Sequence, residues 1–199
     1  MKKLIVLMMA FSIIFSTSFV SNAEEKSNIP EFLTEVVNRC STNVSYTKTC
    51  ISTRENSAVT ICKAYYKDIN TYRIETETPE VVDGSFIDIV HGKKRCYYDC
   101  NTMKLEKIGP APNLLQLIGN SKVRILGAPG DKCVDYEFID ERGEKHYYVV
   151  DNTKKILILT ISYYKDGKES GRDIYSHWKF EKQPEELFDA KSLPVKNDK

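Results

Sequence analysis

The sequence has no strong excess of either charge, and this narrows the range of its partners. Its 199 residues include 29 Lys and Arg against 28 Asp and Glu, and the two signs are interspersed rather than gathered into blocks. Proteins that bind nucleic acids present a basic patch or stripe, because the phosphate backbone is a polyanion. We therefore expect no nucleic-acid partner.

Motifs for redox, metal and hydrolytic chemistry are also missing. The six cysteines include no C-x-x-C pair, and only Cys96 and Cys100 lie close together, with no histidine at a zinc-like offset. The three histidines, His91, His146 and His177, have no serine, cysteine or metal partner in the pattern around them. The sequence therefore predicts no enzyme activity, no metal site and no cofactor.

A long hydrophobic run occurs only at the start. The opening "MKKLIVLMMAFSIIFSTSFVSNAEEK" has two lysines, an apolar run from Leu4 to Phe15, and Ser21-Asn22-Ala23 before two glutamates. This order is typical of a secretory signal peptide cleaved after Ala23, and the run is too short for a transmembrane anchor. No cysteine near Ala23 offers a site for a lipid anchor. We expect cleavage to remove residues 1–23 and residues 24–199 to form one exported domain.

The chain after the signal peptide changes from helical to strand periodicity. In "SNIPEFLTEVVNRC" apolar residues recur at the spacing of an amphipathic helix: Ile29, Phe32, Leu33, Val36 and Val37. From Val44 onward apolar residues alternate with period two between turn signals, which predicts ten or eleven strands joined mostly by hairpins. One short helix interrupts them between Pro112 and Gly119.

The expected fold is mainly β, a curved antiparallel half-barrel. A sheet of so many strands twists and curls, and its concave face must be filled or covered. The N-terminal helix and the short inserted helix are the available cover. Periodicity alone leaves two alternatives open for this face, a dry packed core and a ligand cavity.

Several stretches follow one another in a characteristic order: "KDINTYRIETETPE", "YYDCNTMKLEKI", the inserted helix and "YYVVDNTKKILILTISYYKDGKESGRDIYSHWKFEKQPEELFD". This ordered set resembles the outer-membrane lipoprotein carrier family, the LolA-like proteins, over nearly all of the mature chain. The resemblance implies a half-open barrel whose apolar concave face accepts the acyl chains of a lipoprotein and carries it across the periplasm.

The resemblance also implies which side chains line the cavity. Tyr72-Arg73-Ile74 matches a strand of the family in which an aromatic residue, any residue and a large apolar residue follow one another. The match implies that Tyr72 and Ile74 face the cavity and that Arg73 and Glu75 face the solvent. Plain core packing would need the same residues at Tyr72. The expected ligand-binding residues are Phe32, Val36, Tyr72, Ile74, Ile87, Ile89, Leu114, Leu117 and Ile118.

One departure from the family concerns how the helical lid is held. Carriers of this type place an arginine six residues before the large apolar residue of that strand, where it holds the lid by hydrogen bonds. The corresponding position before Ile74 is Asp68, with Lys67 beside it. Lys67 can act there only as a point charge, without the planar fork of arginine.

The even number of cysteines in an exported chain predicts disulfides. A hairpin turn centred near Asn56 would place Cys50 opposite Cys62, within bridging range. Cys96 and Cys100 would stand about 13 Å apart along a strand, too far to pair with each other.

The four other cysteines allow three connectivities. If the strand after the inserted helix runs antiparallel to Met103–Ile108, Cys133 returns to the end of the sheet where Cys100 lies. That arrangement favours Cys100 with Cys133 and leaves Cys40 to pair with Cys96, which would tether the first helix to the sheet. Free thiols in one of these pairs are the alternative.

The residues and the resemblance together predict a soluble, monomeric carrier or chaperone of the periplasm that binds an acylated lipoprotein or another lipid. A release complex in the inner membrane and an acceptor in the outer membrane would be its further partners. Secretion is the alternative location. An envelope sensor or structural protein with the same fold is the alternative function, and the sequence does not separate it from a carrier.

Overall fold

The computed structural model of the chain describes residues 31–53, 59–78, 85–108, 122–126, 131–139 and 143–194. The predicted signal peptide and inserted helix fall outside these ranges, and with them Leu114, Leu117 and Ile118. The side chain of Phe32 is also outside the described part. No helix within the described ranges is long and apolar enough to span a bilayer.

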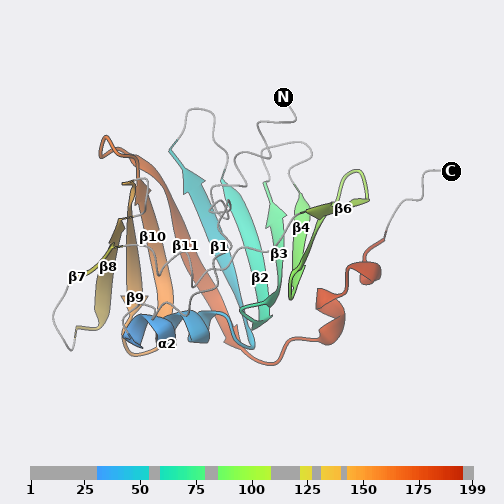
Figure 1. Ribbon diagram of the computed structural model, residues 1–199, viewed down its shortest axis with the longest axis horizontal. Coiled ribbons are helices and arrows are strands. Elements are labelled where there is room, and N and C mark those ends of the chain that lie inside the picture. The colour runs from blue at the N-terminus through green and yellow to red at the C-terminus, as the bar shows by residue number, and fades with distance from the viewer. Residues whose placement is uncertain are drawn as a thin grey trace, which may run out of the picture.

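One open antiparallel sheet with a helix lying across it makes up most of the described chain (Figure 1). The strand order is β6-β5-β4-β3-β2-β1-β11-β10-β9-β8-β7, so β6 and β7 form the two edges. The elements are α2 Glu31–Cys40, β1 Val44–Ser52, β2 Thr60–Asp68, β3 Thr71–Glu77, β4 Phe86–His91, β5 Lys94–Asp99, β6 Lys104–Ile108, β7 Lys122–Leu126, β8 Cys133–Ile139, β9 Lys145–Asp151, β10 Ile156–Tyr163, β11 Glu169–Phe180, and the 3₁₀ helices η1 Glu185–Phe188 and η2 Ala190–Ser192. The predicted mainly-β half-barrel with an N-terminal helix is confirmed.

The chain does not form one continuous meander. It forms two, β1 to β6 and β7 to β11, and the antiparallel pairing of β1 with β11 joins them in the middle of the sheet. Within the described residues β7 pairs with β8 at the opposite edge from β6. The condition for pairing Cys100 with Cys133, that the strand after the inserted helix runs antiparallel to Met103–Ile108, is therefore not met.

The strand register defines two faces of this sheet. Residues opposite each other in antiparallel strands point to the same side, and successive residues along a strand point to opposite sides. Val44, Tyr66, Tyr72 and Val90 are opposite one another across β1 to β4 and pack into one cluster. Phe180 is opposite Val44 on β11, and Arg39 of α2 lies 3.7 Å from the centre of its ring. We call this side the helix face and the other side the second face.

Helix α2 covers the half of the helix face formed by β8 to β10 (Figure 1). Leu33 and Val36 are three residues apart and therefore share one side of the helix. Each is only 3% exposed. They pack against one cluster of strand residues: Val134, Tyr136, Phe138 and Val150.

The segment after β11 covers the second face at β3 to β5. Phe188 of η1 is 2% exposed, and Leu193 packs against Ile89 and Tyr98. The Tyr98 hydroxyl donates a hydrogen bond to the carbonyl of Pro194. Residues 183–194, which we call the C-terminal belt, therefore bury apolar side chains that the sheet would otherwise expose.

Arg73 lies beneath the C-terminal belt and not in solvent. Its side chain donates to the Leu187 carbonyl at 3.3 Å and pairs with Glu75 at 2.8 Å, and the residue is only 9% exposed. The prediction that Arg73 faces solvent is wrong, because strand alternation gives the face but not the segment that covers it.

We expect Phe188→Ala to lower the free energy of unfolding by about 3 to 5 kcal/mol, because it opens a cavity beneath the belt. Glu186→Ala, an exposed change in the same turn, should alter it by less than about 0.5 kcal/mol. Urea denaturation of both variants measures the difference. Equal, small effects would show that the belt does not pack on the sheet.

Candidate functional site

An aromatic row crosses the middle of the helix face. Its rings come from β1, β2, β3 and β11, which are neighbours in the sheet. Adjacent ring centroids lie between 4.3 and 6.2 Å apart, within the range where aromatic pairs attract one another. The aromatic row consists of Tyr46, Tyr66, Tyr72, Tyr175, Trp178 and Phe180.

Burial changes along the aromatic row. Tyr72 and Tyr66 are 3% and 6% exposed, Tyr46 and Trp178 are half-buried, and Phe180 is 39% exposed. Burial also raises the pKa values of Tyr46 and Tyr66, so both hydroxyls stay neutral near pH 7. The partly exposed rings form an uncharged apolar surface of the kind that lines ligand sites.

A charged pair lies beside the aromatic row. Lys48 follows Tyr46 by two residues on β1, and its Nζ is 3.2 Å from Asp173 Oδ2 on β11, with side chains 14% and 24% exposed. Burial acts to lower the pKa of Lys48, but Asp173, with smaller contributions from Cys50 and Tyr175, raises it well above its ordinary value. Lys48 therefore stays charged, and Asp173 balances its charge.

A second charged pair occupies the helix face at β4 and β5. The Arg95 guanidinium donates to both carboxylate oxygens of Asp88, at 2.7 to 3.1 Å. The Asp88 side chain is 2% exposed and that of Arg95 16%. Among the residues that the structure describes, no three His, Cys, Asp or Glu side chains gather to hold a metal ion.

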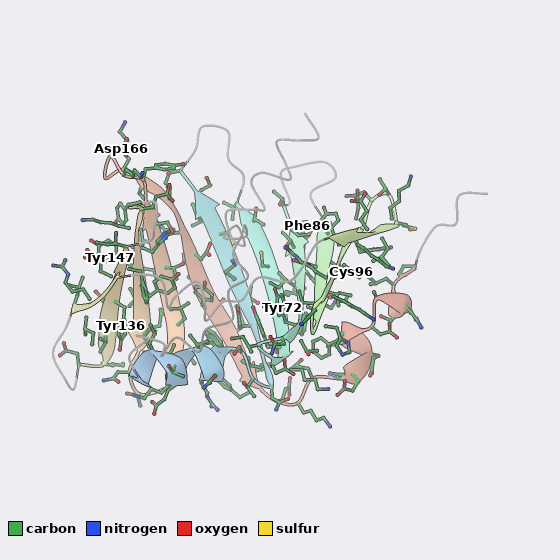
Figure 2. The ribbon with its side chains drawn as sticks, viewed as in Figure 1. Tyr72, Phe86, Cys96, Tyr136, Tyr147 and Asp166 are labelled. Atoms are coloured by element: carbon green, nitrogen blue, oxygen red, sulfur yellow. The ribbon has the colours of Figure 1, made fainter. Side chains whose placement is uncertain are left out.

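Two of the predicted ligand-binding residues lie together on the helix face. Tyr72 belongs to the aromatic row, and Ile74 is half-buried against the same cluster. Val36 belongs to α2, which covers this face, but it packs on the strands in the separate cluster that contains Tyr136. Tyr72 and Tyr136 lie in opposite halves of the sheet (Figure 2). Whether any of these side chains contacts a ligand remains a prediction.

Ile87 and Ile89 do not share a surface with Tyr72. The register places Ile89 opposite Arg73 and Ile87 opposite Glu75, which puts both isoleucines on the second face. Ile89 is buried under the C-terminal belt. Ile87 lines a pocket of about 230 Å³ together with residues that include Ile61, Glu75 and Cys100. The prediction that Ile87 and Ile89 line one cavity with Tyr72 is therefore wrong, because a shift of one residue along a strand moves a side chain to the other face of the sheet.

The residues at the position of the family's lid arginine have other roles. Asp68 accepts a hydrogen bond from the Asn70 backbone N–H at 2.8 Å in the β2–β3 turn. Lys67 pairs with Glu185 of the C-terminal belt at 2.7 Å. Lys67 therefore contacts the segment on the second face, and not α2.

The strand order also corrects two predicted disulfides. Seven strands lie between β5, which ends beside Cys100, and β8, which begins at Cys133. Cys40 packs near β10 on the helix face, whereas Cys96 is opposite Ile89 on the second face of β5. All six cysteines are unbonded in the structure. The pairings Cys100–Cys133 and Cys40–Cys96 are therefore wrong.

The predicted register of the first hairpin is shifted as well. Cys50 is opposite Thr60, and Cys62 is opposite Lys48, so the two cysteines are diagonal neighbours. Their sulfur atoms nevertheless lie 4.0 Å apart.

Sequence reasoning missed Tyr46, Lys48, Asp173 and Trp178. The alternation in "VSYTKTC" already places Tyr46 and Lys48 on the same side as Val44. Asp173 and Trp178 contact Lys48 and Tyr46 only because β1 pairs with β11. The residues around either strand do not indicate this pairing.

Comparison with known proteins gives similarity of fold. No protein-family model matches the chain, and a search of curated proteins finds no match. Among solved structures, an uncharacterized conserved protein from Thermus thermophilus has a TM-score of 0.61 at 14% identity, over 83% of this chain and 96% of its own. The MucA/MucB complex of Pseudomonas aeruginosa gives 0.54 at 12% identity, over 83% of this chain and 62% of that chain.

A LolA superfamily protein from Nitrosomonas europaea also matches, with a TM-score of 0.45 at 9% identity, over 81% of this chain and 97% of its own. At these identities the likeness shows the fold alone, which the chain shares with the Thermus thermophilus protein and with MucB: one open antiparallel sheet with a helix across one face.

We expect Arg95→Met to lower the free energy of unfolding by about 3 to 5 kcal/mol, because it leaves the Asp88 carboxylate buried and unpaired. Arg172 offers a matched control, because two of its nitrogens also bind one carboxylate, that of Glu169. The Arg172 side chain differs in being 44% exposed. Arg172→Met should cost less than about 1 kcal/mol.

Chemical denaturation of the two variants gives both values. Adding Asp88→Asn to Arg95→Met should recover part of the loss, because it removes the unpaired charge. Similar costs for Arg95→Met and Arg172→Met would contradict the burial of this pair.

Proposed function

We propose that this protein is an exported carrier or chaperone of the periplasm that holds the acyl chains of a lipid or lipoprotein against its helix face. The observation that carries the proposal is the aromatic row, which is built from neighbouring strands and is incompletely covered. The fold supports it, because the sheet does not close and one half of its helix face lies beyond α2. The apolar run and Ser21-Asn22-Ala23 at the start of the chain support export.

The energy available from such a surface is sufficient for binding. Each buried methylene of an acyl chain contributes about 0.8 kcal/mol. Ten methylenes would contribute roughly 8 kcal/mol before the cost of immobilising the chain is subtracted. The neighbouring charges do not oppose this, because Lys48 is paired with Asp173 and Arg95 with Asp88.

A sensor that binds a partner protein is the second candidate. The similarity to MucB favours it, since that protein is seen in complex with MucA. A sensor that responds to lipid would use the same helix face for its input. Binding of an acyl probe therefore tests the surface common to both candidates, and transfer of a bound lipoprotein to membranes would distinguish the carrier.

We expect Ile74→Gln to weaken the binding of a fluorescent acyl probe about tenfold, since removing an apolar contact of this size costs roughly 1.4 kcal/mol or more. Glutamine is preferable to a carboxylate, because Asp88 is directly opposite Ile74. Ile174→Gln is the control, since Ile174 lies on the second face and is 40% exposed. It should change the dissociation constant less than about twofold, as surface substitutions have small effects.

Circular dichroism checks that both variants stay folded. The proposal would be contradicted by a wild-type protein that binds no acyl probe. Equal weakening by Ile74→Gln and Ile174→Gln would place binding elsewhere than on the helix face.

A further inference from the structure

Cys50 and Cys62 meet on the helix face, apart from the other four cysteines. They belong to the neighbouring strands β1 and β2, and their sulfur atoms are 4.0 Å apart. The strand order separates this pair from Cys133 on β8 and from Cys96 and Cys100 on and directly after β5, and Cys40 of α2 packs on the cluster that contains Val134 and Val150. Cys96 and Cys100 are four residues apart along one strand, too far to pair with each other. Cys50 and Cys62 are thus the pair whose sulfur atoms already lie close to each other, so a disulfide between them leaves the strand order unchanged.

The register makes this a diagonal pair, not a directly opposed one. Thr60 is the residue opposite Cys50, and Cys62 is two positions further along β2. Diagonal neighbours in an antiparallel pair have Cα atoms about 7 to 8 Å apart, whereas disulfides rarely span more than about 7 Å. A bond between Cys50 and Cys62 therefore requires a local shift of the two strands. Disulfides under such strain are the more easily reduced ones.

The surroundings favour a thiolate at this pair. The Cys50 thiol is the main group that lowers the pKa of Cys62, to about 6, against the opposing effect of burial; Lys48 and the Thr76 hydroxyl contribute further. The Thr76 oxygen is 3.6 Å from the Cys62 sulfur. The same contact with Cys62, together with burial, raises the pKa of Cys50. Cys62 is therefore the sulfur that carries the negative charge, and a thiolate is the form that reacts with disulfides. Cys50 is half-buried while Cys62 is 5% exposed, so an external disulfide reaches Cys50 first.

We propose that Cys50 and Cys62 are a redox-active dithiol that converts reversibly to a strained cross-strand disulfide. This property goes beyond lipid binding and does not depend on it. Both sulfurs lie on the helix face near Lys48: Cys50 is two residues after Lys48 on β1, and Cys62 is opposite Lys48 on β2.

The oxidant is a disulfide, either a small one such as oxidised glutathione or that of a protein oxidant. The Cys50 thiol gives its proton to the Cys62 thiolate, whose sulfur is 4.0 Å away, as the Cys50 sulfur attacks one sulfur of the oxidant, forms a mixed disulfide and releases the first thiolate. Cys62 gives this proton to the released thiolate and, as a thiolate again, attacks the Cys50 sulfur and releases the second thiolate. The first released thiolate thus takes the one proton of the pair and the second takes a proton from water, so one disulfide is reduced to two thiols as the Cys50–Cys62 bond forms.

Intact mass and thiol counting of the oxidised protein test the pairing. After incubation with oxidised glutathione and removal of the excess, we expect the loss of two hydrogen atoms. Four cysteines should be alkylated in the unfolded, unreduced chain and all six after reduction. Peptide mapping should place the bond between Cys50 and Cys62. A chain with no bond, with several bonds, or with a bond between other cysteines would overturn the proposal.

Equilibration with graded ratios of reduced to oxidised glutathione tests the strain. The control is the double variant Thr60→Cys with Cys62→Ser, which moves the second cysteine directly opposite Cys50. The measured quantity is the square of the reduced glutathione concentration divided by the oxidised glutathione concentration at which half of the protein is reduced. We expect this value, for the folded protein, to be at least tenfold lower for the native pair than for the control. A native pair that is reduced only after unfolding, or that is as resistant as the control, would overturn the proposal.

Discussion

The antiparallel pairing of β1 with β11 is the constraint on which the rest of the structure depends. It runs from Val44 opposite Phe180 to Ser52 opposite Gly171 and makes one sheet out of two meanders. Gly171 is needed there, because a Cβ atom would lie 2.9 Å from the carbonyl oxygen of Ile51. The same pairing brings Trp178 against Tyr46, so the candidate site exists only because the first and last strands are adjacent.

Features that depend on local periodicity could be predicted from the sequence. The helical spacing that includes Leu33 and Val36 gave a helix that buries both residues against the sheet. The alternation in "TYRIETE" correctly placed Tyr72 and Ile74 on one face. Both periodicities are read directly from neighbouring residues, because side chains repeat about every 3.6 residues along a helix and every second residue along a strand.

Features that depend on distant segments could not be predicted. Arg73 is buried where η1 contacts β3, and its partner Leu187 comes more than a hundred residues later in the chain. The predicted Cys100–Cys133 bond assumed that strands adjacent in sequence are adjacent in the sheet, and the chain instead passes from one edge to the other between β6 and β7. Periodicity assigns a side chain to a face, but it does not say which strand or segment lies beside it.

The central claim is that the partly covered aromatic row is a binding surface for acyl chains. Trp178 provides a direct test, because it is the one tryptophan of the chain and stacks within this row. Titration with a fatty acid that carries bromine atoms on its chain should quench the Trp178 fluorescence saturably, since bromine quenches on contact, and the unbrominated fatty acid should compete. Binding of the brominated chain without quenching, or no binding at all, would contradict the claim.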